Sequence, residues 1–198
     1  MTQPLSPVAF QWIEDKHSAT AYKVLIAFGF ALATAIGAQI QIRLGFTPVP
    51  ITLQTLFVFS SGLFLGANFG LLSQAMYLAM GLALPVYSQG KHGPEALFGA
   101  TGGYLLGFLL FSYLSGRLFY GRLQRERSWI GQGLQLYLLS LLTIFVPGVT
   151  VLKMVTGASW AQAIAMGYVP FIVGDIIKIG AGLGAARWLL RKRGSQRA

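Results

Sequence analysis

The stretch that decides the fold is residues 168–190, which read YVPFIVGDIIKIGAGLGAARWLL. A membrane-spanning helix needs about 20 consecutive, predominantly apolar residues, and this run has that length. Its charged residues are Asp175, Lys178 and Arg187. A spanning β-strand is shorter and alternates apolar with polar residues, so the run does not fit a strand. We therefore predict a transmembrane helix here.

Comparable apolar runs precede this one and predict five further transmembrane helices. A turn is expected at residues 68–70 (Asn-Phe-Gly), between the second span and a third that ends near Tyr87. A short helix is expected from Ser159, because Gly167 and Pro170 interrupt the helical pattern before the last span. The other predicted spans are residues 23–44, 51–67, 97–118 and 129–152.

The predicted fold is an all-α membrane protein, a bundle of six transmembrane helices. We expect residues 23–190 to form this transmembrane domain, for which substrate binding is the expected role from the residues described below, with residues 1–22 as an N-terminal tail and residues 191–198 as a basic tail, both expected in the cytoplasm. Six spans use about 120 residues, so no separate soluble domain fits in the remainder. The composition agrees, because 55% of the 198 residues are hydrophobic and only 10% are charged, against about 25% charged in a typical soluble domain.

Basic residues predict the orientation. The chain has 15 Lys and Arg against 5 Asp and Glu, a net charge of +10 that could suggest nucleic acid. These cations lie at the ends of apolar runs, so membrane lipid explains them and no nucleic-acid partner is expected. If the chain crosses the membrane six times, the only basic residues in the loops on one side of the membrane are Arg43, Lys91 and Lys153. The positive-inside rule then predicts cytoplasmic termini and a multi-pass protein of the inner (cytoplasmic) membrane. The cations on the cytoplasmic side are Lys16, Lys23, Arg117, Arg122, Arg125, Arg127, Arg187, Arg191, Lys192, Arg193 and Arg197.

Two charged residues within the last span are the main candidates for function. Asp175 and Lys178 are three positions apart, so they share one face of a helix. A charge near the centre of a bilayer costs about 3 kcal/mol even on insertion scales. Two interpretations remain open: a structural ion pair that neutralises itself, and a pocket for a polar ligand.

Two loops offer further polar and aromatic candidates. Between the first two spans, alternating prolines in residues 47–54 (Thr-Pro-Val-Pro-Ile-Thr-Leu-Gln) predict a stiff, extended segment. It presents Thr47, Thr52 and Gln54 at the mouth of the bundle, although Thr52 is also a candidate helix cap. The loop after the third span contributes Val86, Tyr87 and Ser88, and the next span contributes Tyr104. Each tyrosine is either an interface aromatic or a pocket wall.

A row of small residues lies on the first span. Ala27, Ala31 and Ala35 are four residues apart, and such rows allow a second helix to approach closely. That helix belongs either to this bundle or to a separate membrane protein.

The sequence contains no recognisable catalytic set. Asp175 is the only acid within a predicted span, and no histidine lies in one. The absence of cysteine excludes disulfides and thiol catalysis, and His17 with His92 are too few for a histidine-only metal site. No phosphate-binding Walker motif is present, so ATP hydrolysis by this chain is not expected. We therefore predict a protein that is not an enzyme and has no cofactor and no metal.

Five stretches, in this order, resemble the BioY family, the biotin-specific S components of energy-coupling factor (ECF) transporters. They lie within about residues 45–180 and are specific as a set. The stretches are Thr47-Pro-Val-Pro-Ile-Thr-Leu-Gln54, Gly62-Leu-Phe-Leu-Gly66, Tyr77-Leu-x-x-Gly81-Leu-x-x-Pro85-Val86-Tyr87, Thr101-Gly-Gly-Tyr-Leu-Leu-Gly107 and Pro170-Phe-x-x-Gly-Asp-x-x-Lys178.

The resemblance implies a high-affinity membrane subunit for biotin uptake, with six helices, cytoplasmic termini and the first loop beside the vitamin. Asp175 would accept the ureido N–H groups, Lys178 would neutralise the carboxylate tail or the pair, and Val86 with aromatic residues would cover the thiophane ring. An ECF transmembrane coupling protein and ATPase subunits would supply the energy, docked through the row from Ala27 to Ala35. The run 88–92 (Ser-Gln-Gly-Lys-His) departs from the small residues expected there.

Two alternatives remain open. One is an S component for another vitamin, such as thiamin or riboflavin, against which the proline-rich and Gly-Asp-x-x-Lys stretches argue. The other is a small secondary carrier that uses Asp175 for proton coupling, a class in which internal repeats are expected.

Overall fold

The computed structural model describes residues 16–119 and 128–194. Parts of the predicted tails, residues 1–15 and 195–198, lie outside this description, as do the basic residues of the loop 120–127. The first helix begins within the predicted N-terminal tail. The bounds are α1 Lys16–Gln39, β1 Gln41–Ile42, β2 Ile51–Thr52, α2 Gln54–Ala83, α3 Gly93–Phe98, α4 Gly102–Phe119, α5 Trp129–Ser140, α6 Val146–Thr156, α7 Trp160–Gly167 and α8 Ile172–Gly194.

The predicted helical membrane protein is confirmed. Four helical segments of the described chain are long and apolar enough to cross a membrane, by length and composition. Apolar side chains cover the outside of these segments because lipid, rather than water, is the solvent there. The segments are Thr20–Gln39, Gln54–Gly90, Trp129–Thr156 and Trp160–Leu189.

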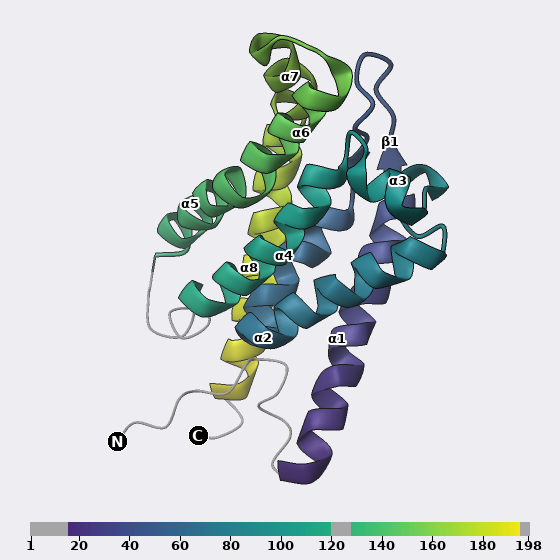
Figure 1. Cartoon of the computed structure of the whole chain (residues 1–198). Helices are drawn as coiled ribbons and strands as arrows, with labels where there is room; N and C mark the ends of the chain where they lie inside the picture. The colour runs from purple at the N-terminus through teal and green to yellow at the C-terminus, as the bar shows by residue number, and fades with distance from the viewer. Residues whose placement is uncertain (1–15, 120–127, 195–198) are drawn as a thin grey trace.

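A sharp bend divides α2 into two limbs. Residues 68–70, where the sequence predicted a turn, are helical, so that prediction is wrong. The helical conformation is interrupted at Gly66 instead, with φ 75° and ψ −178°. Only glycine adopts this region without steric conflict, so the bend occurs at the glycine rather than at the polar residue that follows it. The two predicted spans on either side are therefore the limbs of α2, which meet at the end of the bundle opposite the β-hairpin (Figure 1).

Glycines let α4 pack directly on the bend of α2. A Cβ atom at Gly116 would lie 2.4 Å from the backbone N of Ala67, and one at Gly62 would lie 2.5 Å from the carbonyl oxygen of Ser112. Such contacts leave no room for a side chain. The close approach is accompanied by a hydrogen bond from Ser61 Oγ to Ser112 Oγ (3.1 Å). α4 is therefore held in a fixed position against both limbs.

The alanine row of α1 faces the inside of this chain. Ala27 and Ala31 are fully buried, and Ala35 is 8% exposed. Ala27 packs with Leu65 of α2, and the other two alanines belong to the main core. The row thus serves close helix packing in this chain, and its side chains are not accessible to the separate docking partner that the resemblance implied.

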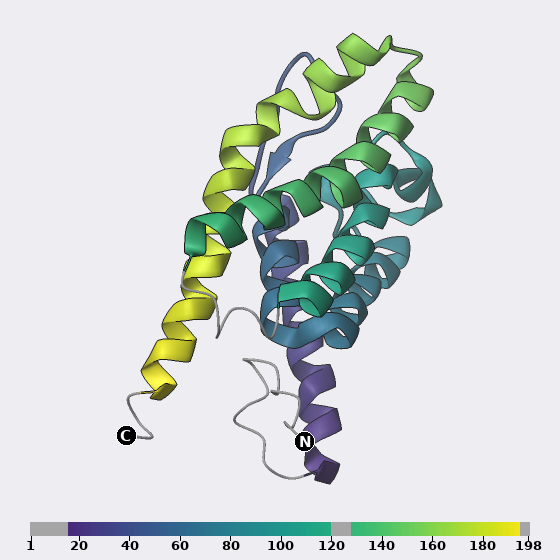
Figure 2. The same cartoon turned by 90° about the vertical axis from the view of Figure 1, so that its left-hand side faces the viewer.

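In the second half of the chain, four helices follow one another from α5 to α8. The predicted span 129–152 is divided into α5, a five-residue π-helical segment Leu141–Phe145, and α6. The short helix predicted from Ser159 is confirmed as α7, which begins with a capping box formed by Ser159 and Gln162. α8 then runs back along the bundle (Figure 2). The π-helical segment could not be predicted because it changes the side-chain phase without a change in composition.

The proline-rich loop is a β-hairpin at one end of the bundle. β1 and β2 pair antiparallel, with Gln41 opposite Thr52 and Ile42 opposite Ile51. α1 begins and α8 ends at the other end of the molecule (Figures 1 and 2). The extended loop expected from the prolines is thus present, with strand pairing in addition.

Substituting Gly116 tests the contact between α2 and α4. We expect Gly116→Ala to lower the stability by about 1–3 kcal/mol, because the new methyl group would overlap backbone atoms that cannot easily move. Thermal unfolding in detergent, followed by tryptophan fluorescence, measures the effect. The matched control is Gly29→Ala in α1, where a Cβ atom meets nothing within 4 Å. Equal melting temperatures for the two variants would contradict the assigned contact.

Candidate functional site

A cavity lies between the β-hairpin, the loop after α2, and the helices α2, α4 and α8. It contains a charged pair, several hydroxyl groups and an apolar wall. Its lining residues are Val49, Pro50, Thr52, Gln54, Thr55, Tyr87, Ser88, Thr101, Tyr104, Leu105, Phe108, Ile144, Phe145, Phe171, Asp175 and Lys178.

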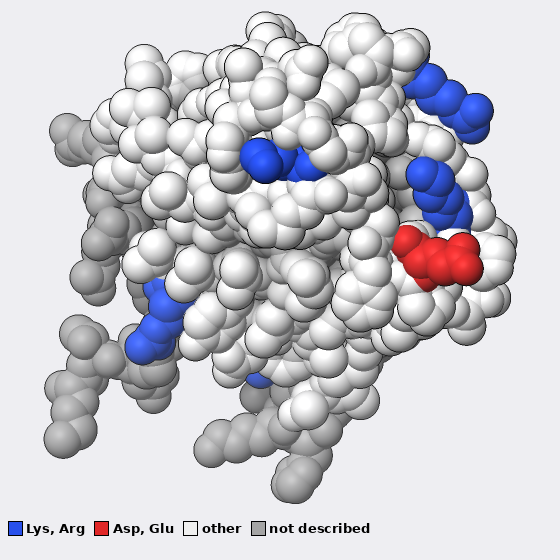
Figure 3. Space-filling view, turned by 45° about the horizontal axis from the view of Figure 1, so that its top comes forward, with Lys and Arg blue, Asp and Glu red and all other residues white. Residues whose placement is uncertain are grey.

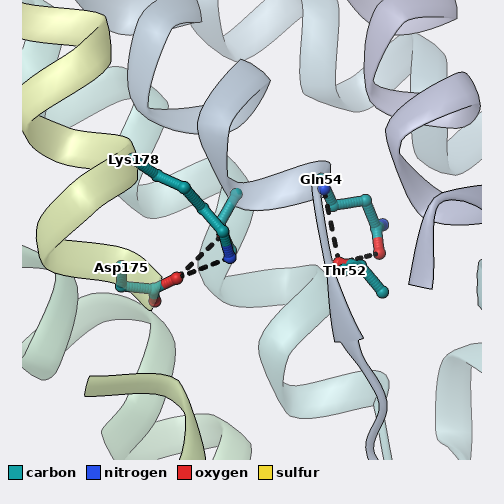
Figure 4. A network of polar contacts seen from close by, with 5 residues as sticks. Thr52, Gln54, Asp175 and Lys178 are labelled. Atoms are coloured by element: carbon teal, nitrogen blue, oxygen red, sulfur yellow. Dashed lines mark hydrogen bonds and ion pairs between the residues drawn. The ribbon is translucent and has the colours of Figure 1, made fainter. Parts of the chain in front are cut away.

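Asp175, Lys178 and Thr55 form a closed set of hydrogen bonds on one side of this cavity. Figure 4 shows the side chains of Asp175 and Lys178 pointing toward each other from α8. Lys178 Nζ lies 2.9 Å from Asp175 Oδ1 and donates to Thr55 Oγ1, also at 2.9 Å. Thr55 Oγ1 in turn donates to Asp175 Oδ1 at 3.0 Å. The two charges come from neighbouring turns of α8, as their spacing predicts, whereas the hydroxyl comes from the first turn of α2. Attraction within the set offsets part of the cost of burying both charges.

The pair retains unused hydrogen-bonding capacity. Asp175 is fully buried, and within the described chain its Oδ2 atom has no hydrogen-bond partner. A buried acceptor without a partner costs free energy, and more so when it is charged. The ammonium of Lys178 has three donors, of which two are used by Thr55 and Asp175. The arrangement therefore offers one acceptor and one donor, side by side, to a group that enters the cavity.

A second polar group lies at the junction of β2 and α2. Gln54 Nε2 donates to the hydroxyl of Tyr77 at 2.6 Å, and Thr52 Oγ1 donates to Gln54 Oε1 at 3.2 Å. Thr52 Oγ1 also accepts from the backbone N–H of Gln54 at 3.3 Å. Thr52 thus supports the start of α2 and lines the cavity as well. The amide of Gln54 is buried and hydrogen-bonded, as a polar group within a membrane protein requires.

The rest of the lining is mainly apolar and aromatic. Tyr104 donates its hydroxyl hydrogen bond to the carbonyl of Gly167 at 2.8 Å, so its ring stands against α7. The ring of Phe145 lies 6.2 Å from that of Tyr104 and 6.0 Å from that of Phe171. Ile144 and Phe145 belong to the π-helical segment, a feature frequently found at functional sites. This wall suits an apolar ring system.

Most of the predicted site residues lie around this one cavity, but two do not line it. Thr47 Oγ1 accepts from the backbone N–H of Val49 at 3.2 Å and so shapes the hairpin. Val86 contributes its carbonyl, which accepts from Gln39 Nε2 at 3.2 Å. Neither of these two side chains lines the cavity. The predicted residues that line the cavity are Thr52, Gln54, Tyr87, Ser88, Tyr104, Asp175 and Lys178.

Sequence reasoning missed Thr55, Thr101, Phe145 and several apolar residues. Thr55 had a signal, since it is a hydroxyl residue next to Gln54 near the start of a predicted span. No feature of the sequence indicated Phe145, because the direction of its side chain depends on the π-helical segment. In the described ranges no group of His, Cys, Asp and Glu residues is suited to hold a metal ion.

The end of the molecule near the cavity is weakly charged. In a view that brings the hairpin end forward, most of the surface is uncharged, with a few separated basic side chains and one acidic area (Figure 3). The described residues on this face form no continuous basic surface of the kind that binds the phosphates of a nucleic acid.

Comparisons with known proteins agree on one family. A family model described as the BioY family matches residues 13–194. The biotin transporter BioY of Thermotoga maritima is 38% identical over 152 residues, which are 76% of this chain and 85% of that protein. The probable biotin transporter BioY of Pyrococcus horikoshii is 35% identical over 162 residues, covering 80% and 90% of the two chains.

A solved structure shows the same fold. The crystal structure of the S-component for biotin from an ECF-type ABC transporter superposes with a TM-score of 0.81, covering 89% of this chain and 95% of the other. The two sequences are 24% identical, so this likeness concerns the fold alone. The family match over residues 13–194 includes the helices that form the cavity, and the two relatives cover 76% and 80% of this chain. This chain belongs to the BioY family.

Proposed function

We propose that this chain is the biotin-binding S component of an ECF-type transporter, which captures the vitamin without changing it chemically. The observation that carries the proposal is the buried Asp175 Oδ2, which has no hydrogen-bond partner among the described residues and lies beside Lys178 in a cavity with a mainly apolar and aromatic wall. Membership of the BioY family, whose named relatives are biotin transporters, supports the same ligand.

The ureido group of biotin fits the polar side of the cavity. Asp175 and Lys178 are bonded to each other, so both meet the same end of a ligand. The carboxylate tail would face a like charge at Asp175, whereas the ureido group presents N–H donors and a carbonyl acceptor together. In the proposed complex, Asp175 Oδ2 accepts from a ureido N–H and Lys178 donates to the ureido oxygen. The thiophane ring then lies against Tyr104, Phe108 and Phe145.

The proposed topology has six crossings with both termini in the cytoplasm. The crossings are α1, the two limbs of α2, α4, the continuous segment α5 to α6, and α8. α1 begins and α8 ends at the same end of the bundle, which supports an even number of membrane crossings (Figures 1 and 2). The excess of basic residues expected at that end supports its cytoplasmic location in the inner membrane. The hairpin and the cavity then face the outside, where biotin arrives.

Energy would come from separate subunits. The sequence has no phosphate-binding loop of the Walker type, so a coupling protein and ATPase subunits are proposed to supply ATP hydrolysis. Because the row Ala27, Ala31 and Ala35 is buried, these partners would contact another part of the membrane-facing surface.

Removing the polar groups one at a time should weaken biotin binding. We expect Asp175→Asn and Lys178→Met each to lower the affinity at least about tenfold, because each removes a charge-assisted hydrogen bond. Thr55→Val keeps the shape but removes the bridging hydroxyl, and we expect a loss of about fivefold. Calorimetric titration of the purified protein with biotin measures all three.

The control for the threonine substitution is Thr150→Val in α6, whose hydroxyl donates to the carbonyl of Val146 and does not line the cavity. It should bind biotin like the wild type. Unchanged affinity in both Asp175→Asn and Lys178→Met would remove the α8 pair from the binding site.

A panel of vitamins should show stabilisation by biotin alone. A ligand at 100 times its Kd stabilises the folded state by about 2.7 kcal/mol. We therefore expect a clear rise in melting temperature with biotin in a thermal-shift assay, and none with thiamin or riboflavin. A rise with one of those vitamins instead would favour an S component of different specificity.

The energy source separates the proposed transporter from a proton-coupled carrier. In cells that express the chain with the coupling and ATPase subunits, depletion of ATP should stop biotin uptake while the proton gradient is maintained. Uptake of labelled biotin measures this. The carrier alternative, with Asp175 as the proton site, predicts the reverse: loss of uptake when the gradient is collapsed with ATP intact.

A further inference from the structure

Gln89 joins the two loops that cover the cavity. Tyr87 and Ser88 line the cavity from the loop after α2, and Val49 and Pro50 line it from the β-hairpin. Gln89 follows directly and makes hydrogen bonds to the hairpin. Its backbone N–H donates to the side-chain Oε1 of Gln41 at 3.2 Å, and its Nε2 donates to the carbonyl of Pro48 at 3.4 Å.

The backbone of Gln89 is strained. It has φ 65° and ψ 20°, and it is the one non-glycine residue with positive φ in the described parts of the chain. Glycine, Asn and Asp adopt this region readily, but a glutamine does so at a cost in free energy. Such a conformation persists only where surrounding contacts hold it. Here the turn is closed by backbone hydrogen bonds from the N–H of Tyr87 to the carbonyl of Lys91 (3.1 Å) and from the N–H of Lys91 to the carbonyl of Ser88 (3.4 Å). The bonds of Gln89 to Gln41 and Pro48 add to them.

The two loops differ in how firmly they are attached to the bundle. The loop after α2 is fixed by Gln39, whose Nε2 donates to the carbonyl of Tyr87 at 3.1 Å, and by the hydroxyl of Tyr87, which donates to Leu78 at 2.7 Å. The hairpin has only a two-residue ladder. Among the described residues, the bond from Gln89 to Pro48 is the only hydrogen bond that joins residues 43–50 to a segment outside the hairpin. The middle of the hairpin is therefore held by this bond and by the packing of Val49 in the core, and it is attached by fewer hydrogen bonds than the loop after α2.

We propose that Gln89 is a positioning residue that holds the β-hairpin closed over the cavity and so sets the rate at which bound substrate leaves. Its two hydrogen bonds favour the closed arrangement, because both join the loop after α2 to the hairpin. The inference rests on the proposed function for the identity of the substrate, which is biotin.

Two substitutions isolate the two hydrogen bonds. Gln89→Glu keeps the length of the side chain but removes the N–H donor to Pro48, and Gln41→Leu removes the acceptor for the backbone of Gln89. Each loses about one neutral hydrogen bond, so we expect labelled biotin to leave about fivefold faster in a chase with unlabelled biotin. The melting temperature of the protein without biotin should remain near that of the wild type. Gln162→Glu in α7 is the control, since Gln162 uses its oxygen in the capping box and lies away from the cavity.

Hydrogen exchange of the protein without biotin tests the same contact independently of the ligand. We expect Gln89→Glu to increase exchange in residues 41–52 while exchange in α2 and α4 is unchanged. If the wild type binds no biotin, the proposed function fails, and the exchange data alone decide the role of Gln89. Wild-type exchange of the hairpin in both variants, together with wild-type biotin release where binding occurs, would overturn the inference.

Discussion

The polar side of the cavity depends on one ion pair, between Asp175 and Lys178. Burying Asp175 and Lys178 costs several kcal/mol per charge before their attraction is counted, so the pair persists only with good geometry and further hydrogen bonds. Thr55 supplies such bonds to both charges at 2.9 and 3.0 Å. The carboxylate still retains an oxygen without a partner in the described chain. This remaining capacity is the physical reason to assign the site to ligand binding rather than to structure alone.

The position of Thr55 opposite α8 depends on how closely the helices pack. The bend at Gly66 and the contacts at Gly62 and Gly116 hold both limbs of α2 against α4, with no side chain between the backbones. On the other side of the cavity, the π-helical segment places Phe145 among Tyr104 and Phe171. Polar and apolar walls therefore come from different parts of the chain, and each is fixed by backbone geometry.

The cover of the cavity is built differently from its walls. The walls are helices whose backbone hydrogen bonds are internal, whereas the cover consists of a short hairpin and a loop joined through Gln89. Val49 also packs in the main core, so the cover is held by apolar contacts as well as by Gln89. In the proposed mechanism the cover opens while the helices stay in place, so that a small solute can be captured and later released.

The sequence by itself determined the membrane-spanning character, the stiff proline-rich loop, and the pairing of Asp175 with Lys178. These follow from local rules: the apolar length of a span, the restricted φ of proline, and the spacing of three residues that puts two side chains on one helix face. Which neighbours the helix faces contact depends on the tertiary structure. In it, the row containing Ala31 is buried inside the chain, and Thr55 is hydrogen-bonded to the ion pair of Asp175 and Lys178. Helical periodicity specifies which residues share a face but not which neighbour covers it, because that depends on bends and close contacts between segments distant in sequence.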